Sequence, residues 1–178
     1  MLLDRLRLPY SVAVPDIDEG ALAAETPDAT ALRLAESKAR AVARDFPDAL
    51  IIGSDQVATL DGSPINKPGA HEAALAQLME MRGRRVIFHT ALCVYDAARA
   101  HADVESVPTT VTFRDYSEAQ ARRYLEMDRP YDCAGSAKIE ALGIALVREV
   151  ESSDPTALIG LPLIALVGML KRAGVDVL

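Results

Sequence analysis

Residues 85–115 read RVIFHTALCVYDAARAHADVESVPTTVTFRD, and this stretch decides the fold. Apolar and polar residues alternate over residues 85–95 and again over residues 105–115, which is the pattern of strands with one buried face. The segment between them, residues 97–102, is short enough to join two neighbours that run in opposite directions. The stretch therefore predicts a long antiparallel pair in the middle of the chain.

Helix and strand patterns continue on both sides of this pair. A capping hydroxyl at Thr26 and a proline at position 27 begin a helix that extends to about residue 44. Asp61-Gly62 is a hairpin signal that follows extended residues 57–60. Further helices are expected over residues 71–82, 117–126 and 162–172, further strands over residues 10–14, 50–53 and 144–150, and a helix tail over residues 2–6.

Together these elements predict an α/β fold, with helices packed against a mixed, partly parallel sheet. The central antiparallel pair disfavours a purely doubly wound topology. The length of 178 residues suits a single domain over residues 1–178, or two small lobes that share a sheet.

The composition narrows the classes of partner. The net charge of −7 disfavours nucleic acid, whose binding needs a basic face. A small anionic substrate is compatible with this charge, because a few lysines or a bound cation can set the local field in a cleft.

The cellular setting is predicted from what the chain lacks. The longest apolar run, residues 157–170, is shorter than the roughly 20 residues of a membrane span, and Pro162 interrupts it. The first residues lack the apolar core of a signal peptide. We therefore expect a cytoplasmic protein with no membrane partner, in which Cys93 and Cys133 are buried, reduced thiols.

Two acidic segments are candidates for chemistry. Pro15-Asp16-Ile17-Asp18-Glu19 holds three carboxylates in four residues, which suits a hard divalent cation or, alternatively, a solvated acidic turn. Asp55 follows the apolar strand at residues 50–53, at an edge where α/β sheets often place ligands. The alternative for Asp55 is a turn residue that bonds to its own backbone.

Three basic residues accompany them. Pro68 restricts Lys67 to an extended conformation, which makes this lysine a candidate phosphate contact. Lys38 lies inside the first long helix and either extends along a buried face or points into a cleft. Lys138 and Glu140 alternate onto one face after the small residues of the segment Asp132-Cys133-Ala134-Gly135-Ser136. Glu140 could accept hydrogen bonds from the N1–H and amino group of guanine, although a glycine turn with a solvated ion pair is the simpler reading.

The combination of these segments, in this order, resembles the Maf family over essentially the whole chain. The resemblance is carried by Pro15-Asp16-Ile17-Asp18-Glu19, residues 32–39, Gly53-Ser54-Asp55-Gln56-Val57, Lys67-Pro68, Phe88-His89-Thr90, residues 132–136 and Gly160-Leu161-Pro162-Leu163. It implies an elongated α/β fold with two lobes around a cleft. It also implies a nucleoside triphosphate pyrophosphatase that uses Mg²⁺ or Mn²⁺, acts on a small-molecule nucleotide and forms a homodimer.

The resemblance assigns roles to single residues. Asp55 matches the family's proton acceptor, and Glu19, Lys38 and Lys67 match its charged cleft residues. Gln56 and Glu140 match the positions that define the 7-methyl-GTP branch. Candidate phosphate or base contacts are Lys138 and Ser136.

These roles suggest a mechanism. We expect Glu19 and Asp55 to lie together with a lysine ammonium beside them and to share the divalent cation. Asp55 would then activate water for attack on the α phosphorus, while Lys38 and Lys67 neutralise the departing pyrophosphate.

The chain departs from the family pattern at its start. Met1-Leu2-Leu3 aligns with a helix that usually follows a strand and a loop rich in Ser and Arg, so we expect an exposed sheet edge or a hole in the core. The departure motivates an alternative function, that of a catalytically weak nucleotide-binding or cell-division regulatory protein.

Overall fold

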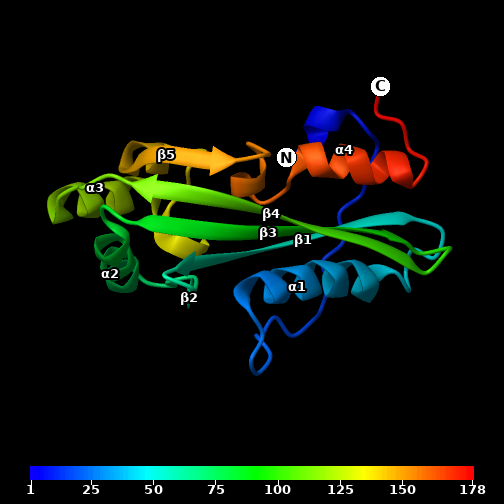
Figure 1. Cartoon of the computed structure of the whole chain (residues 1–178), viewed down its shortest axis with the longest axis horizontal. Coiled ribbons are helices and arrows are strands. Elements are labelled where there is room, and N and C mark those ends of the chain that lie inside the picture. The colour runs from blue at the N-terminus through cyan, green and yellow to red at the C-terminus, as the bar shows by residue number, and fades with distance from the viewer. The chain divides into compact units, whose positions relative to one another are not determined.

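The computed structural model describes residues 1–178 and contains one five-stranded sheet with four α-helices (Figure 1). The strands are β1 (Leu50–Leu60), β2 (Ser63–Ile65), β3 (Arg85–Asp96), β4 (His101–Phe113) and β5 (Val147–Ser152). The helices are α1 (Pro27–Val42), α2 (His71–Met81), α3 (Glu118–Asp128) and α4 (Leu163–Arg172). Four short 3₁₀ helices complete the chain: η1 (Leu3–Leu6), η2 (Ala134–Ser136), η3 (Leu142–Leu146) and η4 (Ala157–Ile159). None of the helices combines the length and the apolar character that a membrane span requires.

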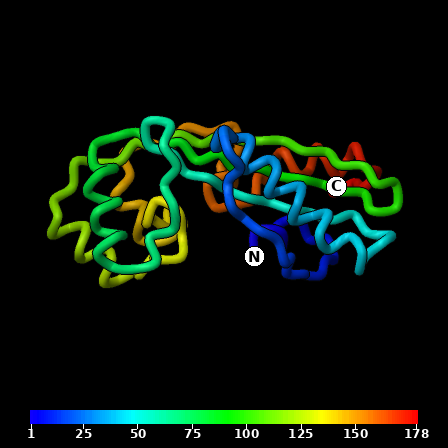
Figure 2. Tube along the Cα trace, turned by 90° about the horizontal axis from the view of Figure 1, so that it is seen from below, coloured from blue at the N-terminus to red at the C-terminus, as the bar shows by residue number.

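The strands follow the order β2-β1-β3-β4-β5. β2 pairs antiparallel with β1, and β5 pairs antiparallel with β4. The predicted central pair is confirmed as β3 and β4, whose connecting turn is the green bend in Figure 2. The α/β fold with flanking helices is confirmed as well. The expected parallel pairing is absent, because hairpins join β1 to β2 and β3 to β4, and α2 returns the chain so that β3 runs back along β1.

The chain divides into two compact units. Unit 1 comprises Met1–Gln56, Thr90–Val107 and Asp154–Leu178, and unit 2 comprises Val57–His89 and Pro108–Ser153. Strands β1, β3 and β4 contribute residues to both units. Each unit has its own helices: α1 and α4 belong to unit 1, and α2 and α3 belong to unit 2.

In unit 1, α1 and α4 cover opposite faces of the strands (Figure 1). The capping role expected of Thr26 is confirmed, because its Oγ1 accepts a hydrogen bond from Ala29 N at 3.2 Å. On the other face, α4 buries an apolar stripe against β3. The members of this cluster are Leu92, Val94, Leu163, Leu166, Met169 and Leu170.

In unit 2, α2 and α3 begin and end close to the positions expected from their sequence signals. Ser117 and Gln120 form a reciprocal capping box at the start of α3. Tyr116, just before this cap, is buried and donates its hydroxyl to Leu78 O of α2 at 2.6 Å. The two helices are thereby joined by a buried hydrogen bond as well as by apolar packing.

The strand predicted at residues 10–14 is wrong. This segment has no regular secondary structure, and its Val12 and Val14 are 67% and 90% exposed. An alternating pattern forms a strand only where another strand can pair with it. Similarly, Ile144 lies in η3, so the last strand begins later than expected, at Val147.

We expected an exposed sheet edge or a hole in the core, and a large apolar groove lies beside the first part of β1. On this side of β1, β2 pairs only with Ala58–Leu60. The groove has a volume of 890 Å³ and lies within unit 1. It is lined chiefly by residues 8–13 on one side, residues 49–52 of β1 on the other, and residues 159–161.

Gly53 is expected to be intolerant of any side chain, because α1 approaches β1 closely at this residue. A Cβ added at Gly53 would lie 2.2 Å from Ala35 O and 3.0 Å from Ala39 N. We predict that Gly53→Ala lowers the free energy of unfolding by about 1–3 kcal/mol through overpacking.

Gly168→Ala is the matched control: the nearest atom to its added Cβ is Arg172 Nη1 at 3.6 Å. Alanine in the middle of α4 should stabilise by about 0.5–1 kcal/mol. Urea unfolding measures both, and a Gly53→Ala protein as stable as wild type would contradict this packing.

Candidate active site

Three charged side chains of unit 1 meet beside β1. Lys38 Nζ, from the second half of α1, lies 2.6 Å from Asp55 Oδ1 and 2.9 Å from Glu19 Oε1. The Lys38 and Asp55 side chains are 19% and 11% exposed, whereas Glu19 is 52% exposed. The expectation that Glu19 and Asp55 lie together with a lysine beside them is confirmed by this geometry.

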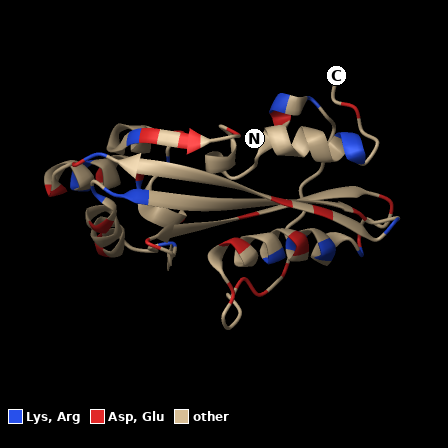
Figure 3. Cartoon of the chain, viewed as in Figure 1, with Lys and Arg blue, Asp and Glu red and all other residues tan.

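The alternation of side chains along β1 determines which residues can meet α1. Gly53 and Asp55 face α1, and the glycine lets the helix approach closely enough for Lys38 to reach Asp55. Acidic residues also gather in the loop before α1, while acidic and basic residues alternate along the helix itself (Figure 3). Lys38 thus points toward a carboxylate rather than along a buried apolar face.

The charge of Lys38 is maintained by its partners. Burial of the ammonium disfavours its charge, but the hydrogen bonds that it donates to Asp55 and then to Glu19 outweigh burial and raise the pKa of Lys38. The lysine therefore stays protonated at neutral pH. The cluster presents one fixed positive charge between two carboxylates.

A second ion pair holds the acidic loop that precedes α1 and carries Glu19. Arg33 of α1 binds both carboxylate oxygens of Glu25, at 2.7 and 2.9 Å, and also donates to Gly20 O at 2.9 Å. Leu22 N donates to the same carboxylate at 3.0 Å. The sequence reading missed Glu25 and Arg33, because a carboxylate before a helix and an arginine within it carry no distinctive spacing.

The neighbours of Asp55 point to the opposite face of β1 and hold η4. Ser54 Oγ lies 2.7 Å from Ala91 O and 2.8 Å from Gly160 O. Gln56 Nε2 lies 2.7 Å from Thr90 Oγ1 and 3.2 Å from both Ala157 O and Leu158 O. The structure therefore does not bring the Gln56 side chain to the Lys38 cluster.

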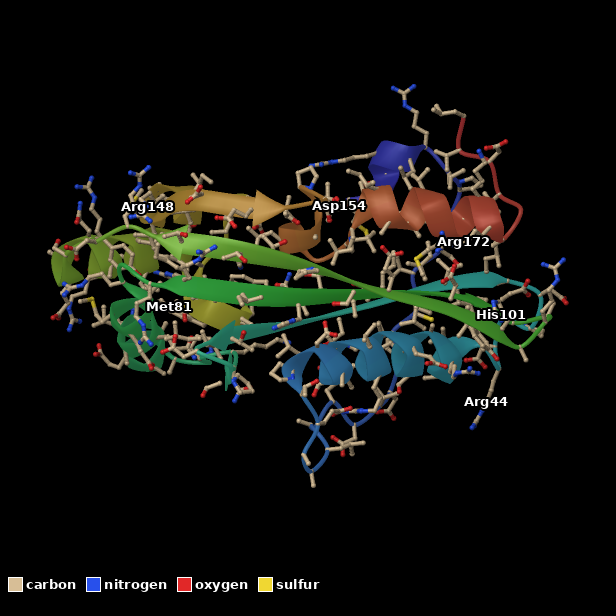
Figure 4. All side chains as sticks on the ribbon, viewed as in Figure 1. Arg44, Met81, His101, Arg148, Asp154 and Arg172 are labelled. Carbon is tan, nitrogen blue, oxygen red and sulfur yellow. The ribbon has the colours of Figure 1, made fainter.

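Asp154 precedes η4 along the chain and is 2% exposed. In space it lies beside the first turn of α4 (Figure 4). Its carboxylate accepts hydrogen bonds from Thr156 Oγ1 at 2.7 Å and from Ile164 N at 2.6 Å. Asp154 thus caps α4 and fixes the approach to it. The sequence reading missed this residue, because it lies nine positions before the helix begins.

The remaining predicted site residues belong to unit 2. Lys67 and Glu140 are exposed. Lys138 is half-buried and paired with Asp132, whose Oδ1 lies 2.9 Å from its Nζ. Ser136 is completely buried and donates its hydroxyl to Gln77 Oε1 at 2.5 Å. The candidate contact assigned to Ser136 is therefore corrected: its side chain faces the protein, because the turn at Gly135 and Ser136 directs it inward.

The donor set of unit 1 fits a divalent cation bound together with a substrate. No group of three or more His, Cys, Asp or Glu side chains is arranged to hold a metal by itself. Mg²⁺ often takes only one or two protein carboxylates and completes its shell with water and substrate phosphates. Glu19 and Asp55 are two such carboxylates on a common neighbour.

Acid should weaken the Glu25–Arg33 ion pair that holds the Glu19 loop. The hydrogen bonds of Glu25 with Arg33 and then Leu22 lower its pKa from 4.5 to about 2. The unfolded chain therefore binds more protons than the folded one between these values, so this stabilisation is complete above pH 4.5 and is lost as the pH falls toward 2.

We predict that Glu25→Gln makes the loss of stability in this pH range shallower by up to about one proton per molecule. The free energy of unfolding, measured in urea from pH 6 to pH 2.5, tests this. Glu36→Gln is the control, because Glu36 forms a half-exposed ion pair with Arg40 within the same helix, does not hold the loop, and should keep the wild-type curve. Identical acid dependence in Glu25→Gln and wild type would show that the ion pair does not hold the loop.

The comparisons with known proteins cover nearly the whole chain. The family model described as Maf-like protein matches residues 1–173. A protein of Cupriavidus metallidurans named 7-methyl-GTP pyrophosphatase is 60% identical over 173 residues, which are 97% of this chain and 87% of the relative. Proteins with the same name in Methylobacillus flagellatus and Burkholderia orbicola are 56% and 60% identical, over 99% and 97% of this chain and 92% and 83% of their own lengths. The match along nearly the whole sequence shows that the chain belongs to the Maf family.

Proposed function

We propose that this chain is a nucleoside triphosphate pyrophosphatase that hydrolyses the α–β phosphate bond of 7-methyl-GTP to the monophosphate and pyrophosphate. The observation that carries the proposal is the contact of Lys38 Nζ with Asp55 at 2.6 Å and with Glu19 at 2.9 Å. The relatives named 7-methyl-GTP pyrophosphatase, at 56–60% identity, support both the reaction and the substrate.

Asp55 is the proposed proton acceptor. Its side chain is 11% exposed, so its carboxylate is shielded but can still reach a water molecule. The Lys38 ammonium fixes one oxygen of this carboxylate, which leaves the other oxygen to orient the water for in-line attack on the α phosphorus. The proton of the attacking water passes to Asp55 as the new P–O bond forms.

Lys38 and Lys67 supply positive charge for the phosphates. Lys38 stays protonated, and it can move from Glu19 toward an anionic substrate without losing its bond to Asp55. Lys67 is exposed, and Pro68 restricts its backbone to extended conformations. We assign Lys67 to the departing pyrophosphate.

Glu19 and Asp55 would hold the divalent cation. Mg²⁺ or Mn²⁺ bound there would neutralise charge on the phosphate oxygens. The half-exposed Glu19 is the more accessible of the two carboxylates.

We assign recognition of the base to Glu140 and an indirect part in it, through η4, to Gln56. The exposed Glu140 carboxylate can accept two hydrogen bonds from the guanine edge, and methylation at N7 adds a positive charge that a carboxylate favours. Gln56 uses its amide hydrogens to hold Thr90 and η4, so we assign it an indirect influence on specificity. The family resemblance also implies a homodimer in the cytoplasm, and both remain predictions.

Asp55→Asn should remove the proton acceptor while preserving the shape of the side chain. We predict a fall in kcat of about 10²–10⁴-fold with a far-ultraviolet spectrum like that of wild type. Release of pyrophosphate from 7-methyl-GTP with Mg²⁺ or Mn²⁺ measures this. Glu36→Gln, which changes a half-exposed carboxylate of α1 that pairs with Arg40, serves as the control. A fully active Asp55→Asn protein would refute the assignment. A wild-type chain that binds the nucleotide without releasing pyrophosphate would instead support a binding or regulatory role.

Glu140→Gln should change the choice of base more than the chemistry. An amide offers one acceptor where the carboxylate offers two, so kcat/KM for 7-methyl-GTP should fall by about 10–100-fold. The values for dTTP and UTP should change much less, because these bases lack the guanine edge. Glu149→Gln, at an exposed carboxylate of β5, is the matched control. Equal losses for all nucleotides would show that Glu140 does not read the base.

A further inference from the structure

Within unit 2, the loop that carries Lys67 is hydrogen-bonded to other segments on both sides of this lysine. On one side, Gly69 N donates to Tyr131 O at 3.0 Å. On the other side, Gln77 Nε2 donates to Asn66 O at 2.8 Å. The phosphate-contacting pair Lys67-Pro68 is therefore held at both of its ends.

The Gln77 amide also reaches the segment that leads to Glu140. Its Oε1 accepts the Ser136 hydroxyl at 2.5 Å, while its Nε2 binds Asn66 O. A hydroxyl donor on one side and a carbonyl acceptor on the other require both halves of an amide. Neither a carboxylate nor an apolar side chain can satisfy both partners at neutral pH.

The turn that Gln77 holds has an unusual backbone. Gly135 and Ser136 have φ values of +74° and +51°, and Ser136 is completely buried. The region φ > 0 is sparsely populated by residues other than glycine and persists where the surroundings enforce it. A Cβ added at Gly135 would lie 3.4 Å from Phe88 Cζ and 3.8 Å from the sulfur of Met81, which Figure 4 labels at the end of α2. Core packing holds one side of the turn, and Gln77 holds the other.

We propose that Gln77 is a positioning residue that keeps the phosphate contact, Lys67, and the base-reading segment that ends at Glu140 in one fixed arrangement. This inference rests on the proposed function. Gln77 touches no substrate: it acts through Asn66 O and through the Ser136 hydroxyl. Its removal therefore affects the contribution of Lys67 as well as the rigidity of the loop.

A double-mutant cycle between Gln77→Leu and Lys67→Ala tests the coupling. Leucine matches glutamine in size but bonds to neither partner. Gln77→Leu should lower kcat/KM for 7-methyl-GTP about tenfold, mainly through KM. The loss caused by Lys67→Ala should be at least threefold smaller in the Gln77→Leu background than in wild type. Equal losses in both backgrounds would overturn the inference, and so would a Lys67→Ala change without effect in an active wild-type protein.

Tyr116→Phe is the matched control for a merely structural role. It deletes another hydrogen bond to α2, the one from the Tyr116 hydroxyl to Leu78 O, without touching either segment. It should leave the full penalty of Lys67→Ala intact at a comparable thermal midpoint. A reduced penalty here too would assign the effect to general destabilisation and overturn the proposal.

Amide hydrogen exchange gives a readout that is independent of activity. The Gly69 amide, bonded to Tyr131 O, should exchange at least fivefold faster in Gln77→Leu than in Tyr116→Phe or wild type. Unchanged protection would show that Gln77 does not hold the loop. If wild type released no pyrophosphate, the proposed function would fail, and the exchange rates would still decide whether Gln77 joins the two segments.

Discussion

The contact of one ammonium with two carboxylates is the interaction on which the proposed function of this chain depends. Lys38 brings α1, the acidic loop and β1 to one point, and each partner needs a separate structural device to be there. Gly53 admits the helix, and Arg33 holds the loop through Glu25. A shielded charge is costly unless opposite charges compensate it, so Lys38 needs both the loop and the strand to bring carboxylates to it.

Within this cluster, the residue that positions and the residue proposed to react are different. Lys38 orients Asp55 through its hydrogen bond to one carboxylate oxygen, and the other oxygen is left for the proposed proton transfer. Glu19, the more exposed of the two carboxylates, is the partner that a substrate or a cation can most readily take over. In the proposed mechanism, a single exchange of partners therefore converts the resting ion pair into the catalytic arrangement.

Much of this arrangement could be predicted from the sequence, because the signals are local. The hydroxyl and proline at positions 26 and 27 set the start of α1, and the alternation in residues 85–115 set the central hairpin. The convergence of Glu19, Lys38 and Asp55 required the family resemblance, since no spacing along a chain shows which residues meet across a helix and a strand.

The errors of the sequence reading arise where a side chain or strand depends on distant partners. Residues 10–14 have strand composition but pair with no strand, so they stay irregular. The inward direction of Ser136 follows from its positive φ, which composition does not reveal. Gln77 resembles any polar helix residue until Asn66 and Ser136 are seen on either side of it. Long-range hydrogen bonds of this kind become visible only in three dimensions.

The burial of the two cysteines has a consequence for how the protein withstands oxidants. Cys93 is buried as expected and Cys133, at the start of the η2 turn, is half-buried. Burial raises the pKa of Cys133 to about 11 and that of Cys93 to about 12. Oxidants and alkylating reagents attack the thiolate, which is then roughly one part in 10⁴ of Cys133 at neutral pH. The turn before Glu140 should therefore survive peroxide and iodoacetamide that would inactivate an enzyme with a reactive thiol at the same place.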